Sequence, residues 1–349
     1  MKAPFVWFGG KRRVAPEVWA ALGDVPNYIE PFAGSLAVLL GRPHDMSNGT
    51  RRAETVNDAD GFLANFWRAL AHDPEAVAHW CDWPVNEVDL FARHLWLVNT
   101  GRSRLLEGME ADPDFYDAQV AGWWVWGVNA WIGSGWCSGD GPWVDTGDGI
   151  GKRPHLGNAG RGVERRLPHL GNAGRGVNRK LPHLGDAGRA GYNNMEYRPN
   201  VLGYFEELAG RLRDVRVCCG DWSSVCTSGA MSYGSKVGVF LDPPYLGDVR
   251  TADLYAVDDH TIAHAVRDWC LEHGDDPRLR IVLAGYRAEH DDLMPDTWRR
   301  HYYSASAAYS TTESAARQDG NHANRANEVL WFSPHCVTPD RQGELWEAL

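Results

Sequence analysis

The stretch Asn27-Tyr28-Ile29-Glu30-Pro31-Phe32-Ala33-Gly34-Ser35-Leu36-Ala37-Val38-Leu39-Leu40 decides the fold class of this chain. Its first three residues suit a short strand, positions 30–35 are rich in turn-forming residues, and the apolar run at 36–40 suits a helix. A strand that passes through a glycine turn into a helix is the opening unit of α/β nucleotide-binding folds.

The neighbouring segments continue this pattern. Positions 14–22 suit a helix, and Glu54-Thr55-Val56-Asn57-Asp58 suits a second strand that ends in an acidic residue. The apolar positions of 62–70 then share one helical face. An acidic residue at the end of the second strand can bond ribose hydroxyls, so Asp58 is a candidate ligand. The alternative is that Asp58 only caps the helix that follows.

Strand and helix patterns return in the last third of the chain. We expect strands at 215–219, 237–241, 280–284 and 328–332, and a helix that Asp258 or Asp259 caps, with Ile262, Ala265, Val266 and Trp269 on one face. Alternating strands and helices predict a mostly parallel sheet with helices on both sides.

The region between these halves has a different composition. Six of the 17 tryptophans lie at 123–143, where they could form a core or stack on bases. A 14-residue repeat begins at Pro154, Pro168 and Pro182, and it is too short and too poor in apolar residues for a stacked solenoid. We interpret the repeats as an extended basic loop, with a solvated spacer as the alternative.

Net charge alone argues against a nucleic-acid partner, because the 349 residues sum to −11. The charge is unevenly distributed, however. Positions 151–191 hold nine basic and two acidic residues, a net +7 that leaves −18 on the rest of the chain. A basic, glycine-rich segment of this kind suits DNA phosphates.

Other features of the composition narrow the class of protein. The length fits one large domain or two medium ones, and 44% hydrophobic residues with 23% charged ones are typical of a globular chain. No apolar run is long enough for a membrane span or a signal peptide, so we expect a cytoplasmic protein that does not bind membranes. The seven cysteines and 14 histidines show no metal-ligand spacing, and no metal is expected.

The strongest chemical signal is Asp242-Pro243-Pro244-Tyr245, which follows the apolar run 237–241. This position puts it at the carboxyl edge of the predicted sheet, where open α/β folds bind ligands. A carboxylate beside a proline carbonyl suits an exocyclic amino group with two N–H donors, and Tyr245 could stack on the ring that carries it. The alternative is a plain turn with a surface Asp.

Six motifs in order resemble the D12 class of Dam-like DNA methyltransferases, over roughly residues 5–70 and 215–335. They are Trp7-Phe8-Gly9-Gly10-Lys11, Glu30-Pro31-Phe32-Ala33-Gly34-Ser35, Asn57-Asp58, Gly220-Asp221-Trp222, Asp242-Pro243-Pro244-Tyr245, and Asn324-Arg325 with Glu328-Val329-Leu330. The resemblance implies a Rossmann-like S-adenosylmethionine-dependent methyltransferase sheet with an inserted target-recognition domain. It implies a bacterial or phage enzyme that modifies adenine N6 in double-stranded DNA, as restriction-modification enzymes do.

The resemblance also assigns roles to individual residues. The catalytic residues would be Asp242, Pro243, Pro244 and Tyr245. S-adenosylmethionine would contact Trp7, Lys11, Pro31, Phe32, Gly34, Asp58, Asp221 and Trp222, with Lys11 pairing with the methionine carboxylate. From charge, the DNA contacts would be Arg153, Arg161, Arg165, Arg166, Arg175, Arg179 and Lys180.

The expected organisation is a catalytic domain at 1–70 and 200–349 with an insertion at 71–199 that carries the repeats at 154–190. The insertion has Asn129-Ala130-Trp131-Ile132-Gly133-Ser134-Gly135-Trp136 where the family often has an N-G-hydrophobic-x-R segment, so the recognised sequence stays open. Cytosine-N4 methylation, an RNA substrate and a catalytically silent DNA-binding relative remain as alternatives. The sequence leaves the oligomeric state open, with a monomer as one option.

Overall fold

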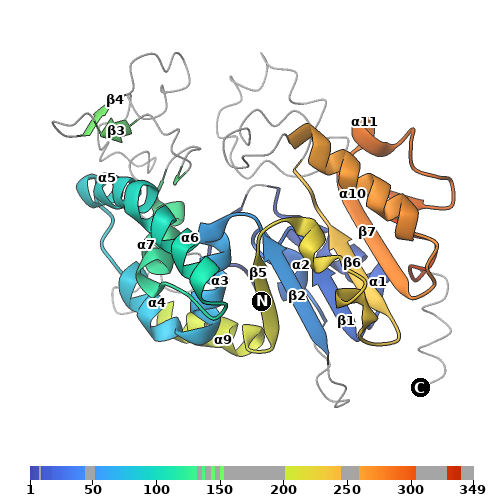
Figure 1. The fold of residues 1–349 in the computed structure, drawn as a ribbon, viewed down its shortest axis with the longest axis horizontal. Coiled ribbons are helices and arrows are strands. Elements are labelled where there is room, and N and C mark those ends of the chain that lie inside the picture. The colour runs from blue at the N-terminus through green and yellow to red at the C-terminus, as the bar shows by residue number, and fades with distance from the viewer. Residues whose placement is uncertain are drawn as a thin grey trace, which may run out of the picture. The chain divides into compact units, whose positions relative to one another are not determined.

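The computed structural model describes residues 1–7, 9–43, 52–131, 136–137, 143–145, 150–152, 201–244, 259–303 and 328–338. The chain forms two compact units (Figure 1). One, here called the helical unit, comprises residues 1–6 and 60–213; the other, the sheet unit, comprises residues 7–59 and 214–349.

Seven strands of the sheet unit form one sheet in the order β5-β2-β1-β6-β7-β9-β8. Figure 1 shows β5, β2, β1, β6 and β7 side by side, and these five are parallel, whereas β9 is antiparallel to both β7 and β8. The strands are β1 (Asn27–Glu30), β2 (Ala53–Asp58), β5 (Val215–Cys219), β6 (Val237–Leu241), β7 (Leu279–Tyr286), β8 (Arg299–Tyr303) and β9 (Glu328–Phe332). The predicted mostly parallel sheet is therefore confirmed.

The order of these strands determines where a ligand can bind. The chain builds outward from β1 through β2 to β5 and then returns to place β6 on the other side of β1. This reversal makes the junction of β1 and β6 a topological switch point, and ligands of open α/β sheets bind outside the carboxyl ends of the strands at such a point. β6 ends one residue before Asp242.

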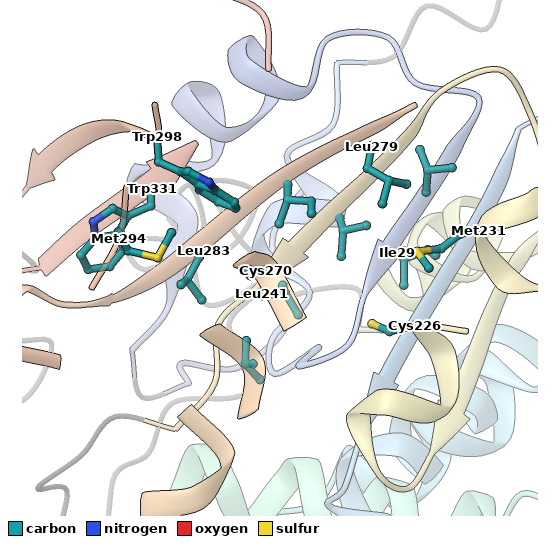
Figure 2. Packing of buried hydrophobic residues seen from close by; sticks show 14 of the residues in the cluster. Ile29, Cys226, Met231, Leu241, Cys270, Leu279, Leu283, Met294, Trp298 and Trp331 are labelled. Atoms are coloured by element: carbon teal, nitrogen blue, oxygen red, sulfur yellow. The ribbon is translucent and has the colours of Figure 1, made fainter. Parts of the chain in front are cut away.

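Helices cover both faces of this sheet. Alternate residues of β6 point to opposite sides: Val239 and Leu241 join a core that includes Cys270 of α10, whereas a Cβ at Gly238 would lie 2.9 Å from Cγ2 of Val25, just beyond α1. Figure 2 shows part of the first core. The helical elements of this unit are η1 (Lys11–Arg13), α1 (Ala15–Leu22), α2 (Ala37–Leu40), η5 (Trp222–Val225), η6 (Ala230–Ser232), α10 (Asp259–His273) and α11 (Arg287–His290).

The helical unit has an aromatic core. Phe5 from the N-terminal segment packs edge-on against Phe66 of α3 and Trp124 of α7, with ring centroids 5.5 and 5.3 Å away, and Phe205 of α9 reaches Phe66 at 6.3 Å. The elements are α3 (Gly61–His72), α4 (Pro74–Cys81), α5 (Glu87–Trp96), the π-helical turn η2 (Leu97–Gly101), α6 (Arg102–Ala111), α7 (Ala118–Ala130), β3 (Trp143–Asp145), β4 (Ile150–Lys152) and α9 (Val201–Leu212).

The tryptophan cluster contributes to this core. Trp124, Trp126 and Trp131 are buried, as the core interpretation predicts. Trp126 also lies against the guanidinium of Arg93, whose carbon is 4.3 Å from the ring centroid, and its indole N–H donates to the Trp83 carbonyl at 2.9 Å. These buried indoles are held inside the fold and are not surfaces for stacking on bases.

The compact helical unit extends beyond the insertion expected at 71–199, because α3 packs against α4 and α7, and α9 packs against α3 and α4. The assignment of 71–199 to target recognition stays a prediction. The repeats at 154–190 lie outside the described residues. Within the part of the chain that the structure describes, no helix combines the length and apolar character needed to cross a membrane.

Candidate active site

The loop after β1 approaches the N-terminal segment of the sheet unit at Gly34. This residue has a φ of +47°, in the left-handed region that favours glycine. A Cβ there would lie 3.0 Å from Cδ1 and 3.2 Å from Nε1 of the Trp7 indole. Glycine therefore allows the turn and also makes room for Trp7, so two residues expected at the cofactor site are next to each other.

Asn57 and Asp58, at the end of β2, hold the neighbouring loops in place. The Asn57 side-chain amide donates to the Pro31 carbonyl at 3.1 Å and to the Gly220 carbonyl at 2.9 Å. The Asp58 carboxylate accepts from the Gly34 N–H at 2.9 Å. The three strand ends are thus connected by side-chain hydrogen bonds.

The alternative role for Asp58, that of capping the next helix, is wrong. Asp60 is the N-cap of α3, and its carboxylate accepts from the backbone N–H groups of Phe62 and Leu63. Asp58 lies two residues earlier and is 7% exposed at the sheet edge. Its carboxylate is instead hydrogen-bonded to the loop that contains Gly34.

The loop after β5 brings Asp221 and Trp222 to the same edge. Asp221 caps η5 by accepting from the Ser223 N–H at 2.9 Å. The Trp222 indole stacks on the Phe32 ring with centroids 6.2 Å apart and an interplanar angle of 25°, and it meets Trp269 of α10 edge-on at 6.4 Å. An aromatic pair with an acidic side chain nearby has the character of a site for a nucleoside.

Asp242, the first residue after β6, forms an ion pair with Lys11. Lys11 Nζ lies 3.0 Å from the Asp242 carboxylate, and the two side chains are 5% and 20% exposed. The same ammonium donates to the Gly9 carbonyl at 2.8 Å. Pro243 is buried and Pro244 is half-buried, so this edge loop leaves the sheet in a constrained path.

Glu30, at the end of β1, is a second carboxyl group close to this pair. It is 2% exposed and accepts a 2.9 Å hydrogen bond from the Tyr28 hydroxyl. Burial raises the pKa of Glu30 to about 8, and the negative charges of Asp242 and Glu54 act in the same direction. Glu30 is therefore mostly protonated at neutral pH, which keeps a second full negative charge away from Asp242.

The structure brings together most of the site residues expected from sequence. Contacts connect Trp7 with Gly34, Gly34 with Asp58, Pro31 with Asn57, Phe32 with Trp222, and Lys11 with Asp242. Tyr245 and the seven basic residues proposed to contact DNA, namely Arg153, Arg161, Arg165, Arg166, Arg175, Arg179 and Lys180, lie outside the described residues.

Sequence reasoning did not assign roles to Glu30, Asn57 or Trp269. Glu30 and Asn57 were visible as parts of motifs, but their roles come from contacts with Tyr28 and with the Pro31 and Gly220 carbonyls. Trp269 was visible as an apolar helix position, and its contact with Trp222 depends on how α10 packs on the sheet.

The donor set at this edge fits S-adenosylmethionine. Three features suit an adenosine group: the space that Gly34 leaves beside Trp7, the stacked rings of Phe32 and Trp222, and the Asp58 carboxylate. The Lys11 ammonium suits a carboxylate. The nucleoside portion and the amino-acid portion of this cofactor thus both have matching groups.

The seven-stranded, mostly parallel sheet is consistent with a methyltransferase fold. Residues 7–85 match the family model described as D12 class N6 adenine-specific DNA methyltransferase, which confirms the resemblance and supports DNA methyltransferase activity. The match includes the glycine turn and Asp58, and it ends before Asp221 and Asp242. A search of curated proteins found no match.

Proposed function

We propose that this chain transfers a methyl group from S-adenosylmethionine to adenine N6 in double-stranded DNA. The observation that carries the proposal is the position of Asp242 at the carboxyl end of β6, beside the switch point and paired with Lys11, in a chain whose first 85 residues include the family match. Residues 1–70 and 200–349 would form the catalytic domain, and 71–199 would recognise the target.

The cofactor would be held by the loops at the ends of β1, β2 and β5. Pro31, Phe32 and Gly34 would line the adenosine position together with Trp7, and Asp58 would bond the ribose. Asp221 and Trp222 would contact the adenine, and Lys11 would pair with the methionine carboxylate. When bound, S-adenosylmethionine supplies a methyl group activated by a positively charged sulfur.

The target base would be placed by the loop after β6. An adenine inside a duplex is out of reach, so it would be flipped out at a cost of a few kcal/mol. Its N6 would donate to the Asp242 carboxylate and the Pro243 carbonyl, which favours a more tetrahedral nitrogen with an available lone pair. Asp242 would stabilise the positive charge that develops on N6, and the proton would leave afterwards. Pro244 would stiffen the loop and Tyr245 would stack on the base.

The basic repeats would contact DNA phosphates. Deleting Pro154 to Leu181 removes one acidic residue, Glu164, and six of the seven basic residues proposed to contact DNA, and it leaves Arg153 in place. The deletion should weaken DNA binding and flatten its dependence on salt. Titrations of labelled duplex at several salt concentrations measure this slope. An unchanged slope would make the repeats a spacer.

The central test is transfer of a labelled methyl group from S-adenosylmethionine to unmodified duplex DNA. Asp242→Ala should abolish transfer while the protein still binds the cofactor. Asp268→Ala is the matched control, because Asp268 is exposed on α10 and pairs at the surface with Arg267. If no DNA accepts a methyl group at low salt, the enzyme proposal is wrong and a silent DNA-binding protein remains.

The product identifies the chemistry. Digestion of methylated DNA to nucleosides should yield N6-methyladenosine in its deoxy form. N4-methylcytosine would instead show that the same amine-binding loop acts on cytosine, and competition between duplex DNA and RNA would reveal an RNA substrate.

A further inference from the structure

The ion pair between Lys11 and Asp242 places two functions of the proposed site in conflict. Lys11 is the cation expected to hold the methionine carboxylate, and Asp242 is the acceptor expected to hold the base amine. In the structure these two groups pair with each other, and Nζ of Lys11 lies 3.0 Å from Oδ1 of Asp242. A lysine ammonium presents three donors, and one already goes to the Gly9 carbonyl at 2.8 Å.

The surroundings of Lys11 favour a fixed position of its ammonium, whichever carboxylate pairs with it. Its side chain is 5% exposed, and Lys11 is the first residue of η1. Its ammonium donates to the carbonyl of Gly9, a residue with a φ of +70°. Asp242 is four times more exposed, at 20%, and lies in the loop after β6. Water can therefore solvate the Asp242 carboxylate when the pair separates, whereas Lys11 favours another anion because a buried ammonium is costly without a counter-ion.

We propose that Lys11 is an exchangeable partner for two carboxylates, so that the cofactor carboxylate takes Lys11 from Asp242 and thereby makes Asp242 available to the base amine. This inference rests on the proposed function, because it assumes that S-adenosylmethionine binds at the sheet edge. It adds an order of events: the acceptor for the target amine is withheld until the methyl donor is in place.

The exchange has a thermodynamic consequence that can be measured without DNA. In the wild-type chain, part of the binding free energy of the cofactor carboxylate is used to separate Lys11 from Asp242. Removing the charge of Asp242 removes this competition, so it should strengthen cofactor binding although it destroys a proposed catalytic group. A residue that only contacts the cofactor would have the opposite effect.

The experiment is calorimetric titration of the full chain with S-adenosylhomocysteine, which carries the carboxylate, and with 5′-methylthioadenosine, which lacks it. The variants are Asp242→Asn, Lys11→Gln and the double variant. Asp268→Asn serves as a surface control with the same chemical change. Far-UV circular dichroism of each variant checks that it is folded.

We expect Asp242→Asn to bind S-adenosylhomocysteine about tenfold more tightly than the wild type, a factor within the range of ordinary couplings between sites. The same substitution should change the affinity for 5′-methylthioadenosine by less than about twofold. In the Lys11→Gln background it should change the affinity for S-adenosylhomocysteine by less than about twofold. Asp268→Asn should bind like the wild type.

Two results would overturn the inference. Asp242→Asn could bind S-adenosylhomocysteine no more tightly than the wild type, or the gain could persist in full without Lys11, which would make it simple charge repulsion. In either case the proposed function survives, because the cofactor still binds. If folded wild-type protein binds neither nucleoside, the proposed function itself fails and the exchange fails with it.

Discussion

Replacing Glu30 by glutamine should change how the stability of the sheet unit depends on pH. Burial holds the pKa of Glu30 at about 8, against an ordinary value of 4.5. Between these pH values the folded chain keeps a proton that the unfolded chain releases. The stability associated with this proton is therefore fully present below pH 4.5 and is lost as pH rises through about 8. The glutamine side chain would be neutral at every pH, and its amide oxygen could still accept from Tyr28.

The size of the effect follows from the shift in pKa. One pKa unit corresponds to about 1.4 kcal/mol, so Glu30 should cost the wild type about 3 kcal/mol between about pH 5.5 and pH 8. Relative to the wild type, Glu30→Gln should gain about 3 kcal/mol over the same interval.

Urea unfolding at several pH values, followed by circular dichroism, measures the difference between the two proteins. Comparing variant with wild type cancels the other groups that titrate, including His94 and His290, whose pKa values burial lowers to about 4. Asp276→Asn, at an exposed ion pair with Arg278, controls for removing one carboxylate. A variant curve parallel to that of the wild type from about pH 5.5 to 8 would refute the claim that Glu30 is protonated in the fold.

Three further substitutions test the packing around the site and the helical core. Gly34→Ala should cost about 1 kcal/mol for the left-handed φ and should weaken S-adenosylhomocysteine binding in calorimetry, because its Cβ would press on the Trp7 indole. Asn57→Leu should cost about 2 to 3 kcal/mol in urea unfolding, because two loop carbonyls lose their donor. Trp124→Ala should cost about 3 to 5 kcal/mol in the helical unit, which thermal unfolding would detect.

The sheet unit was predictable because its signals are local. The strand predicted at 27–29, the glycine turn and the buried strand at 237–241 each have a distinctive pattern of apolar and turn residues. The structure has both strands, and the first extends one residue further, to Glu30. The edge strand β8 was not predicted, because Arg299-Arg300-His301-Tyr302-Tyr303 is polar and only its pairing with β9 makes it a strand. Composition does not reveal such pairing.

The helix at 62–70 was predicted and is part of α3, but the other helices of the helical unit escaped prediction for a different reason. α7 holds Trp123, Trp124 and Trp126 with two glycines, so its apolar residues surround the helix and give no one-sided periodicity. Gly122 is needed because a Cβ there would lie 2.4 Å from the Trp80 Cβ. This close approach of α4 and α7 is a tertiary requirement, and the sequence shows only a glycine among tryptophans.

The contacts of the candidate site could not be predicted from local sequence patterns, because they join residues that are far apart in the chain. These contacts explain how four carboxyl groups can lie at one edge of the sheet. Glu30 is kept protonated by burial, Asp58 accepts from the Gly34 N–H, and Asp221 caps η5. Each of these carboxyl groups stabilises a strand or a loop, so moving it would disturb the backbone. Asp242 instead forms an ion pair with the Lys11 side chain, an interaction that involves no backbone group of a strand or a turn. The four groups share one edge because parallel strands end there, but different contacts hold them, and the carboxylate that the proposed chemistry needs is held by an ion pair with a side chain.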